Sequence, residues 1–125
     1  KAFQQHEPGT IATMLRMSFR TQFTDPATLE LSELYVPDDY VARSSQFGAM
    51  MVDLESFDFH AALTSVTVPA LVLYGTDEPG ATFGGTAIAD ALPNATYALI
   101  PNAGHFPFIE NPAAFFVTVR EFLDR

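Results

Sequence analysis

Residues 69–79 read PALVLYGTDEP, a short apolar run that breaks at Gly75 into a loop with two carboxylates. A continuous apolar run of this length is typical of a parallel strand that is covered on both faces. Residues 96–100 read TYALI and make a second candidate strand. Residues 86–92, which lie between the strands and are followed by Pro93-Asn94, are expected to form a helix. The pattern therefore predicts one βαβ unit of an α/β fold, with a right-handed crossover.

The loop after the second strand carries a histidine. Residues 100–108 read IPNAGHFPF, which places His105 just after the strand and a glycine directly before it. A histidine here is a candidate general base, and the carboxylates of the first loop are the groups that orient and stabilise a charged imidazole. The sequence contains no Gly-x-Ser-x-Gly motif, so the usual partner nucleophile is absent from these 125 residues.

The remainder of the chain is predicted to be helical. A C-terminal helix should begin at Asn111-Pro112 and bury one apolar stripe. That stripe consists of Phe115, Phe116, Val119, Phe122 and Leu123. Before residue 58, hydrophobic spacing and capping signals predict three helices: one over residues 10–22, a short one from Asp25-Pro26 through Leu34, and one that begins near Tyr40. Met50 and Met51 in the third helix are candidate substrate contacts, with ordinary helical core packing as the favoured alternative.

Composition excludes several classes of protein. The chain has 15 acidic and 6 basic residues, a formal net charge of -9, which argues against binding to nucleic acid or to an anionic membrane surface. It has no cysteine, and therefore no disulfide framework, thiolate metal site or thiol nucleophile. No apolar run approaches the 20 residues or so of a spanning helix. We expect a globular, soluble and cytoplasmic protein.

Two parallel strands do not make a self-sufficient sheet, because parallel sheets are stable when both faces are covered and several strands share the edges. The first residue is Lys1 rather than an initiator methionine. We therefore expect the chain to begin inside a longer sequence. Further strands would come from a partner chain or from a preceding segment of the same gene product.

Several linked segments together resemble the C-terminal half of an α/β-hydrolase. They are residues 68–79, 91–95, 103–112, 115–116 and 122–123. The resemblance implies that residues 58–125 are the C-terminal part of a doubly wound core, with two parallel strands and their helices. These strands would be the seventh and eighth of the family's sheet. Residues 1–57 would be the end of the family's helical cap, or lid, and a missing N-terminal portion would complete the fold.

The same resemblance assigns roles to individual residues. His105 would be the general base, Phe106 with Pro107 would form an apolar wall that excludes water, and Phe106 would contact substrate. The family's acid usually stands three residues after the glycine that ends the strand, often before a proline, and that position is Glu78. Many relatives have Asp there, and Asp77 is the alternative acid, with a turn-capping role as its other explanation.

The resemblance also implies an activity. Esterases and proline-iminopeptidase-like enzymes of this fold cleave carboxylic esters or small amides, and the nucleophilic serine would lie in the missing N-terminal half, as a separate chain or segment. No cofactor and no metal are implied. Two alternatives stay open: a dehalogenase-like hydrolase with an aspartate nucleophile, and a ligand-binding member of the fold without catalysis.

The other polar clusters have simpler explanations. His6 and His60 lack neighbours at the spacing that zinc requires. Ser44-Ser45 lies on a predicted helix rather than on the sharp turn that exposes a nucleophilic serine. Asp53, Glu55 and Asp58 are expected to be solvated in a linker. None of these is therefore taken as a site residue.

Overall fold

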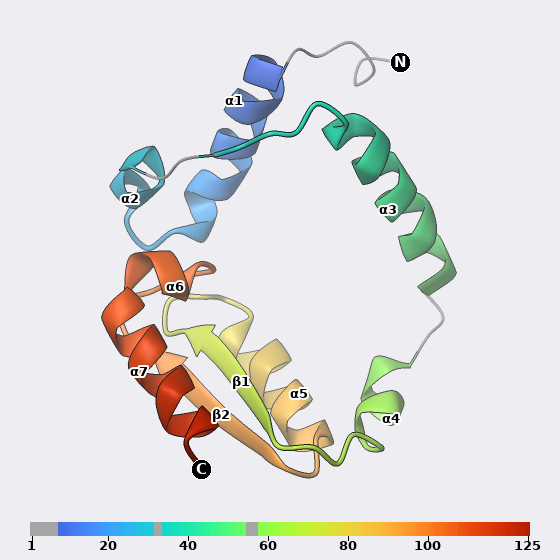
Figure 1. Cartoon of the computed structure of the whole chain (residues 1–125), viewed down its shortest axis with the longest axis vertical. Helices are drawn as coiled ribbons and strands as arrows, with labels where there is room; N and C mark the ends of the chain where they lie inside the picture. The colour runs from blue at the N-terminus through green and yellow to red at the C-terminus, as the bar shows by residue number, and fades with distance from the viewer. Residues whose placement is uncertain (1–7, 32–33, 55–57) are drawn as a thin grey trace.

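The computed structural model describes residues 8–31, 34–54 and 58–125. Its elements in chain order (Figure 1) are α1 (Pro8–Phe19), the 3₁₀ helix η2 (Arg20–Gln22), α2 (Pro26–Leu31), α3 (Tyr40–Leu54), α4 (Phe59–Leu63), β1 (Ala70–Gly75), the π-helical turn η3 (Ala81–Gly85), α5 (Thr86–Ala91), β2 (Ala95–Ile100), α6 (Pro107–Glu110) and α7 (Pro112–Leu123).

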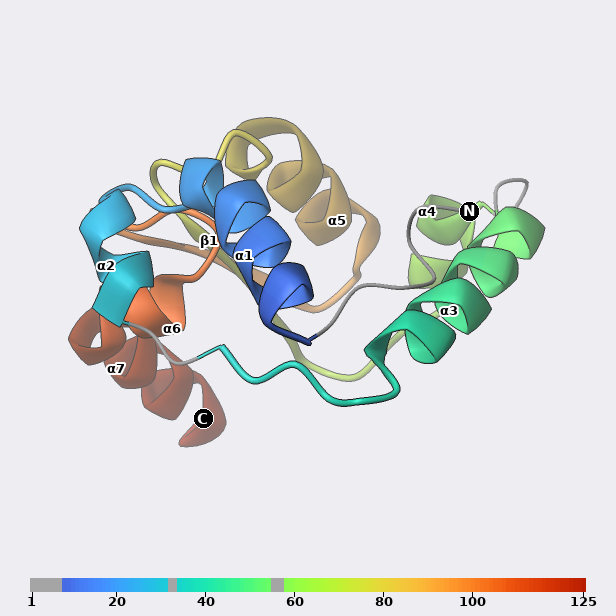
Figure 2. The same cartoon turned by 90° about the horizontal axis from the view of Figure 1, so that it is seen from above.

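The predicted α/β class and the parallel pair of strands are confirmed. β1 and β2 pair in parallel and in register, from Ala70 opposite Ala95 to Gly75 opposite Ile100. Val72 and Ile100 of these strands are buried, and α5 and α7 lie on opposite faces of the sheet (Figures 1 and 2). The apolar runs thus form strands because helices cover both faces of this part of the sheet.

Tyr97 of β2 ties the strand to the crossover connection. Its hydroxyl donates a hydrogen bond to the carbonyl oxygen of Ala81 in η3, over 2.6 Å. Burial, with the neighbouring Tyr74 as a second cause, raises the pKa of Tyr97. The hydroxyl is therefore protonated, and available as a donor, throughout the neutral pH range.

The helices before residue 58 largely follow the prediction. The predicted helix over residues 10–22 is α1 with the 3₁₀ turn η2 at its end, and α3 begins at Tyr40 as expected. α2 begins at Pro26 but ends at Leu31, so Leu34 lies outside it. The Arg16 guanidinium donates a hydrogen bond to the Leu29 carbonyl over 2.9 Å, which joins α1 to α2.

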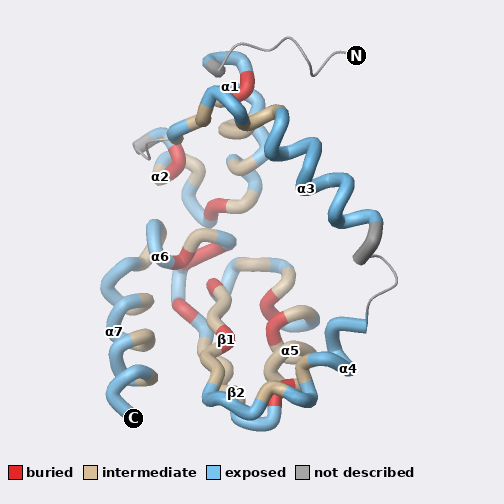
Figure 3. The backbone as a smooth tube through the Cα atoms, turned by 45° about the vertical axis from the view of Figure 1, so that its right-hand side comes forward, coloured by how far each residue is buried: buried red, intermediate tan, exposed pale blue. Residues whose placement is uncertain are grey.

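Two predictions about burial are wrong for the described chain. On α7 the predicted buried stripe is only partly covered: Phe116 is 46% and Leu123 is 70% exposed, because a two-stranded sheet is too narrow for the apolar face of this helix. On α3, the residues from Ala42 to Val52 are exposed (Figure 3), so Met50 and Met51 do not pack in a helical core.

The predicted domain boundary after residue 57 adjoins residues 55–57, outside the described residues, and stays a prediction.

Candidate active site

The in-register strands bring two loops together at the carboxyl edge of the sheet. The Thr76 amide donates to the Ile100 carbonyl, and the Asp77 amide to the Ala103 carbonyl, each over 2.9 Å. A Cβ atom on Gly75 would overlap the carbonyl oxygens of Ala103 and Gly104. Glycine is therefore required where β1 ends, because the second loop passes directly over its Cα atom.

His105 and Glu78 meet across these two loops. Nδ1 of His105 lies 3.0 Å from Oε2 of Glu78, and the side chains are 55% and 17% exposed respectively. An ionised carboxylate can only accept hydrogen bonds, so this contact requires the proton on Nδ1 and leaves Nε2 free as an acceptor in the neutral ring. The geometry can therefore hold the imidazole in one tautomer and one orientation.

Asp77, the alternative acid, is engaged elsewhere. Its Oδ2 accepts a hydrogen bond from the Thr24 hydroxyl over 3.0 Å, and its Oδ1 accepts one from the Thr76 hydroxyl over 3.1 Å. The structure therefore places Glu78 against His105 and places Asp77 against the segment that follows η2.

The backbone of the His105 loop is held by two acceptors. The His105 amide donates to the Gln22 carbonyl over 2.8 Å, and the amides of Gly104 and Phe106 donate to Oε2 of Glu110 over 2.8 and 3.3 Å. Sequence reasoning assigned no role to Glu110, because its partners are backbone amides, which leave no pattern of residue types. The one available signal was a carboxylate close after the histidine.

An open cavity of about 230 Å³ adjoins the pair. It is lined by Leu73, Tyr74, Gly75, Glu78, Gly104, His105 and Pro107. The lining combines apolar walls with the polar groups of Tyr74, Glu78 and His105, as small-molecule sites commonly do.

Phe106 lies beside the histidine but faces the N-terminal helices. Its ring stacks on Phe23 with the centroids 4.8 Å apart and meets Phe19 edge-on at 5.5 Å, while His105 contacts it edge-on at 5.0 Å. The predicted Met50 and Met51 are on α3, which runs apart from this loop edge (Figures 1 and 2). The structure thus brings Phe106 to the histidine but does not bring the two methionines there.

The remaining candidates lie away from the pair. His60 is exposed on α4, and His6 lies outside the described residues. The Ser45 hydroxyl on α3 donates a hydrogen bond to the Val41 carbonyl over 2.9 Å, and Asp58 caps α4 by accepting a hydrogen bond from the Ala61 amide.

Within residues 8–31, 34–54 and 58–125, no three His, Cys, Asp or Glu side chains gather as a metal site would require. No helix in those ranges is long and apolar enough to cross a bilayer.

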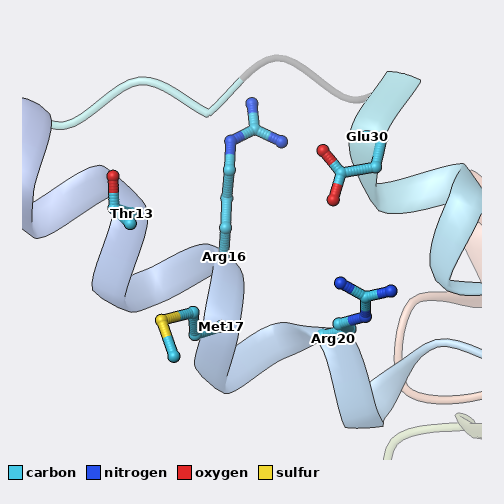
Figure 4. Close-up of a pocket in the computed structure, with 5 residues that line it drawn as sticks. All are labelled: Thr13, Arg16, Met17, Arg20 and Glu30. Atoms are coloured by element: carbon cyan, nitrogen blue, oxygen red, sulfur yellow. The ribbon is translucent and has the colours of Figure 1, made fainter.

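A second hollow of about 210 Å³ lies between α1, η2 and α2. Figure 4 shows Arg16, Arg20 and Glu30 pointing toward a common space there, with Thr13 and Met17 beside them. Two cationic side chains and one anionic side chain line this hollow, and none of the predicted site residues does.

Comparison with known proteins finds similar chains among curated proteins and among solved structures. A proline iminopeptidase from Levilactobacillus brevis is 30% identical over 70 residues, which are 56% of this chain and 23% of that protein. The solved structure of a serine hydrolase involved in carbazole degradation has a TM-score of 0.67 at 20% identity and covers 89% of this chain and 46% of its own. The enol-lactonase from Burkholderia xenovorans LB400 has a TM-score of 0.59 at 24% identity, over 98% of this chain and 47% of its own.

The chain thus spans less than half of these solved structures, and its matched part is about a quarter of the curated relative. A family model described as "Alpha/beta hydrolase family" matches residues 2–119, nearly the whole chain. Together with the parallel strands and the loops at their carboxyl ends, this match shows that the chain belongs to the alpha/beta hydrolase family.

Proposed function

We propose that this chain is the C-terminal part of a hydrolase that cleaves a carboxylic ester or a small amide bond, with His105 as general base and Glu78 as its acid. The observation that carries the proposal is the 3.0 Å contact between His105 Nδ1 and Glu78 Oε2 at the carboxyl edge of the paired strands. The name of the Levilactobacillus brevis relative, a proline iminopeptidase, supports cleavage of an amide bond.

The reaction follows from the protonation state that the pair requires. Nε2 of His105 takes the proton of a serine hydroxyl while the serine oxygen attacks the substrate carbonyl carbon, and Glu78 stabilises the imidazolium that forms. The imidazolium then gives its proton to the departing alcohol or amine, which leaves an acyl-serine. Water, activated by the same nitrogen, attacks the acyl group and releases the carboxylic acid and the free serine.

The serine would come from outside residues 1–125, in an N-terminal portion that is either a separate chain or a segment of the same chain. The sequence contains no Gly-x-Ser-x-Gly motif, and more than half of the His105 side chain is exposed and thus open to a group from elsewhere. The same portion would supply the backbone amides that stabilise the tetrahedral oxyanion.

We further propose that residues 1–57 form the end of a helical cap over the site and residues 58–125 part of the core. The Phe106 ring, packed on Phe19 and Phe23, would close the apolar side of the pocket where the two parts meet. Met50 and Met51 are exposed apolar side chains on α3, and in the complete protein they would line the substrate's path into the site.

A serine-directed fluorophosphonate probe tests the proposal on the complete protein, this chain together with its N-terminal portion. We expect covalent labelling, and mass spectrometry of the digested protein should locate the label on a serine outside residues 1–125. His105→Gln should slow labelling by about 10²- to 10⁴-fold, since the general base is lost. His60→Gln, which changes an exposed histidine on α4, is the matched control and should label at the normal rate.

Three results would overturn the proposal. A label on Ser44 or Ser45 would place the nucleophile within this chain. Ester or carbon–halogen cleavage without labelling would point to an aspartate nucleophile, and binding of small molecules without turnover or labelling would point to a receptor.

A further inference from the structure

The carboxylate of Glu110 binds backbone amides from two distant parts of the chain. Its Oε1 accepts a hydrogen bond from the Thr24 amide over 2.6 Å, and its Oε2 accepts from the amides of Gly104 and Phe106. Hydrogen bonds to an ionised acceptor are shorter and stronger than those between neutral groups. One side chain at the end of α6 therefore joins the His105 loop to the segment that follows η2.

We propose that Glu110 is a positioning residue for His105: it fixes the His105 loop and couples the orientation of the imidazole to the placement of the N-terminal helices. The catalytic consequence rests on the proposed function, whereas the coupling itself is a property of this chain. Residues 22–24, which we call the clamp segment, are the point at which the helices meet the loop.

Glu110 and the Gln22 carbonyl hold the backbone of the His105 loop. Gly104, His105 and Phe106 lie between β2 and α6, outside regular secondary structure, so no ladder of backbone hydrogen bonds places them. Their three consecutive amides donate instead to Oε2 of Glu110 and to the Gln22 carbonyl. A Cβ atom on Gly104 would overlap the Gln22 carbonyl oxygen, so the loop and the clamp segment are in direct backbone contact.

The clamp segment also contacts the loop that carries Glu78. The Thr24 hydroxyl donates to Oδ2 of Asp77, the neighbour of Glu78. The clamp segment therefore contacts the loop of the histidine, the carboxylate of Glu110 and the loop of the acid. A displacement of η2 would act on both sides of the contact between His105 and Glu78.

Catalysis tolerates only a small displacement of the imidazole. Catalytic geometry is demanding, and a misplacement of about 1 Å can cost about 10²-fold in rate. The Nδ1–Oε2 contact joins two separate loops, and more than half of the His105 side chain is exposed. Its position is therefore set by the backbone of the loop, which Glu110 holds.

The test compares Glu110→Gln with Glu121→Gln in the complete protein. Glutamine keeps the size of the side chain but has one acceptor oxygen, so it can serve either Thr24 or the pair Gly104 and Phe106, not both. Glu121 is an exposed carboxylate on α7 and controls for the loss of one charge. Glu110→Asp, which keeps both oxygens one methylene further back, is the second variant and covers the case in which Glu110→Gln does not fold.

Two readouts separate positioning from a general loss of structure. The first is kcat per active site. Active sites are counted by fluorophosphonate titration, so unfolded molecules are excluded from the enzyme concentration. We expect a fall of about 10- to 100-fold for Glu110→Gln with KM changed by less than about threefold, and no change for Glu121→Gln. The second is the NMR resonance of the His105 Nδ1 proton, which should shift or broaden in Glu110→Gln and return toward its original position in Glu110→Asp.

The outcomes are distinct. An unchanged kcat per titrated site together with an unmoved Nδ1 proton in Glu110→Gln would overturn the coupling. If the unsubstituted protein is never labelled, the proposed function fails, and the resonance of the Nδ1 proton alone tests whether Glu110 positions His105. A shift of this resonance in Glu110→Gln but not in Glu121→Gln supports the coupling. No shift in Glu110→Gln refutes it.

Discussion

The two adjacent carboxylates of the first loop have different partners. Glu78 accepts from the amide of Gly80 with Oε1, over 3.2 Å, and presents Oε2 to His105. Asp77 accepts from two threonine hydroxyls. Because a side chain so engaged would have to break these bonds to reach the imidazole, the two carboxylates do not exchange roles without rearrangement of the loop.

Replacing each carboxylate by its amide distinguishes the two. Glu78→Gln should lower kcat by about 10⁴-fold, because the amide neither favours the required tautomer nor stabilises the imidazolium. Asp77→Asn keeps one acceptor oxygen and should stay within about tenfold of the original rate. Steady-state hydrolysis of an activated ester by the complete protein measures both effects. A large loss of kcat in Asp77→Asn with little loss in Glu78→Gln would show that Asp77, not Glu78, is the acid.

Some of this residue-level detail is accessible from the sequence. The two apolar runs, each followed by a polar loop, predicted that His105 and the carboxylates of residues 77–78 lie in facing loops, and the resemblance to α/β-hydrolases singled out Glu78. The role of Glu110 was not predictable, because an acceptor for backbone amides needs a particular path of the chain rather than a particular neighbouring residue type. For the same reason the hydrogen bond from the His105 amide to the backbone carbonyl of Gln22 was not predictable from the sequence.

At the scale of elements, the junction between β1 and its loop is the most constrained point. The register of the strands places Gly75 opposite Ile100, and the loop from β2 then folds back over it. The strands, α1, α3, α5 and α7 follow from hydrophobic periodicity and capping residues. The short elements η3 and α6 do not follow from the sequence, because four or five residues give too little periodicity. The exposure of Phe116 and Leu123 on α7 could not be predicted either, because it depends on the width of the sheet.

Alanine at two glycines tests this constraint. Gly75→Ala should destabilise the complete protein by about 3 kcal/mol or more, since its methyl group meets backbone oxygens that cannot move independently of both loops. Gly48→Ala on α3 meets nothing within 4 Å and should stabilise by about 0.5–1 kcal/mol through helix propensity. Urea unfolding of both variants provides the comparison, and equal midpoints would contradict the close approach.

At the scale of the whole molecule, large apolar side chains remain uncovered. Phe47 on α3 is 60% exposed and Leu123 on α7 is 70% exposed, and the sheet in the described residues has two strands. Exposed apolar area of this kind marks surfaces that other parts of a protein cover. A partner segment that adds strands would cover them, in line with the proposed N-terminal portion.

Expression of residues 1–125 alone tests that expectation. We expect self-association or a gradual, non-cooperative transition in urea, with binding of a hydrophobic dye, because the sheet lacks neighbours. The complete protein, measured by the same size-exclusion and unfolding experiments, should be homogeneous and unfold cooperatively. A monodisperse monomer of residues 1–125 with one sharp transition would be incompatible with the need for a partner segment.

The register of the two strands also bears on how such a site can diverge. Because Gly75 faces Ile100 across the ladder, the separation of the two loops is set by the spacing of adjacent strands, roughly 4.8 Å, and not by the connection between them. Residues 81–94 carry neither the histidine nor its carboxylate. The connection can therefore change in length without separating the histidine from its carboxylate, provided that η3 and α5 keep their contacts with the sheet.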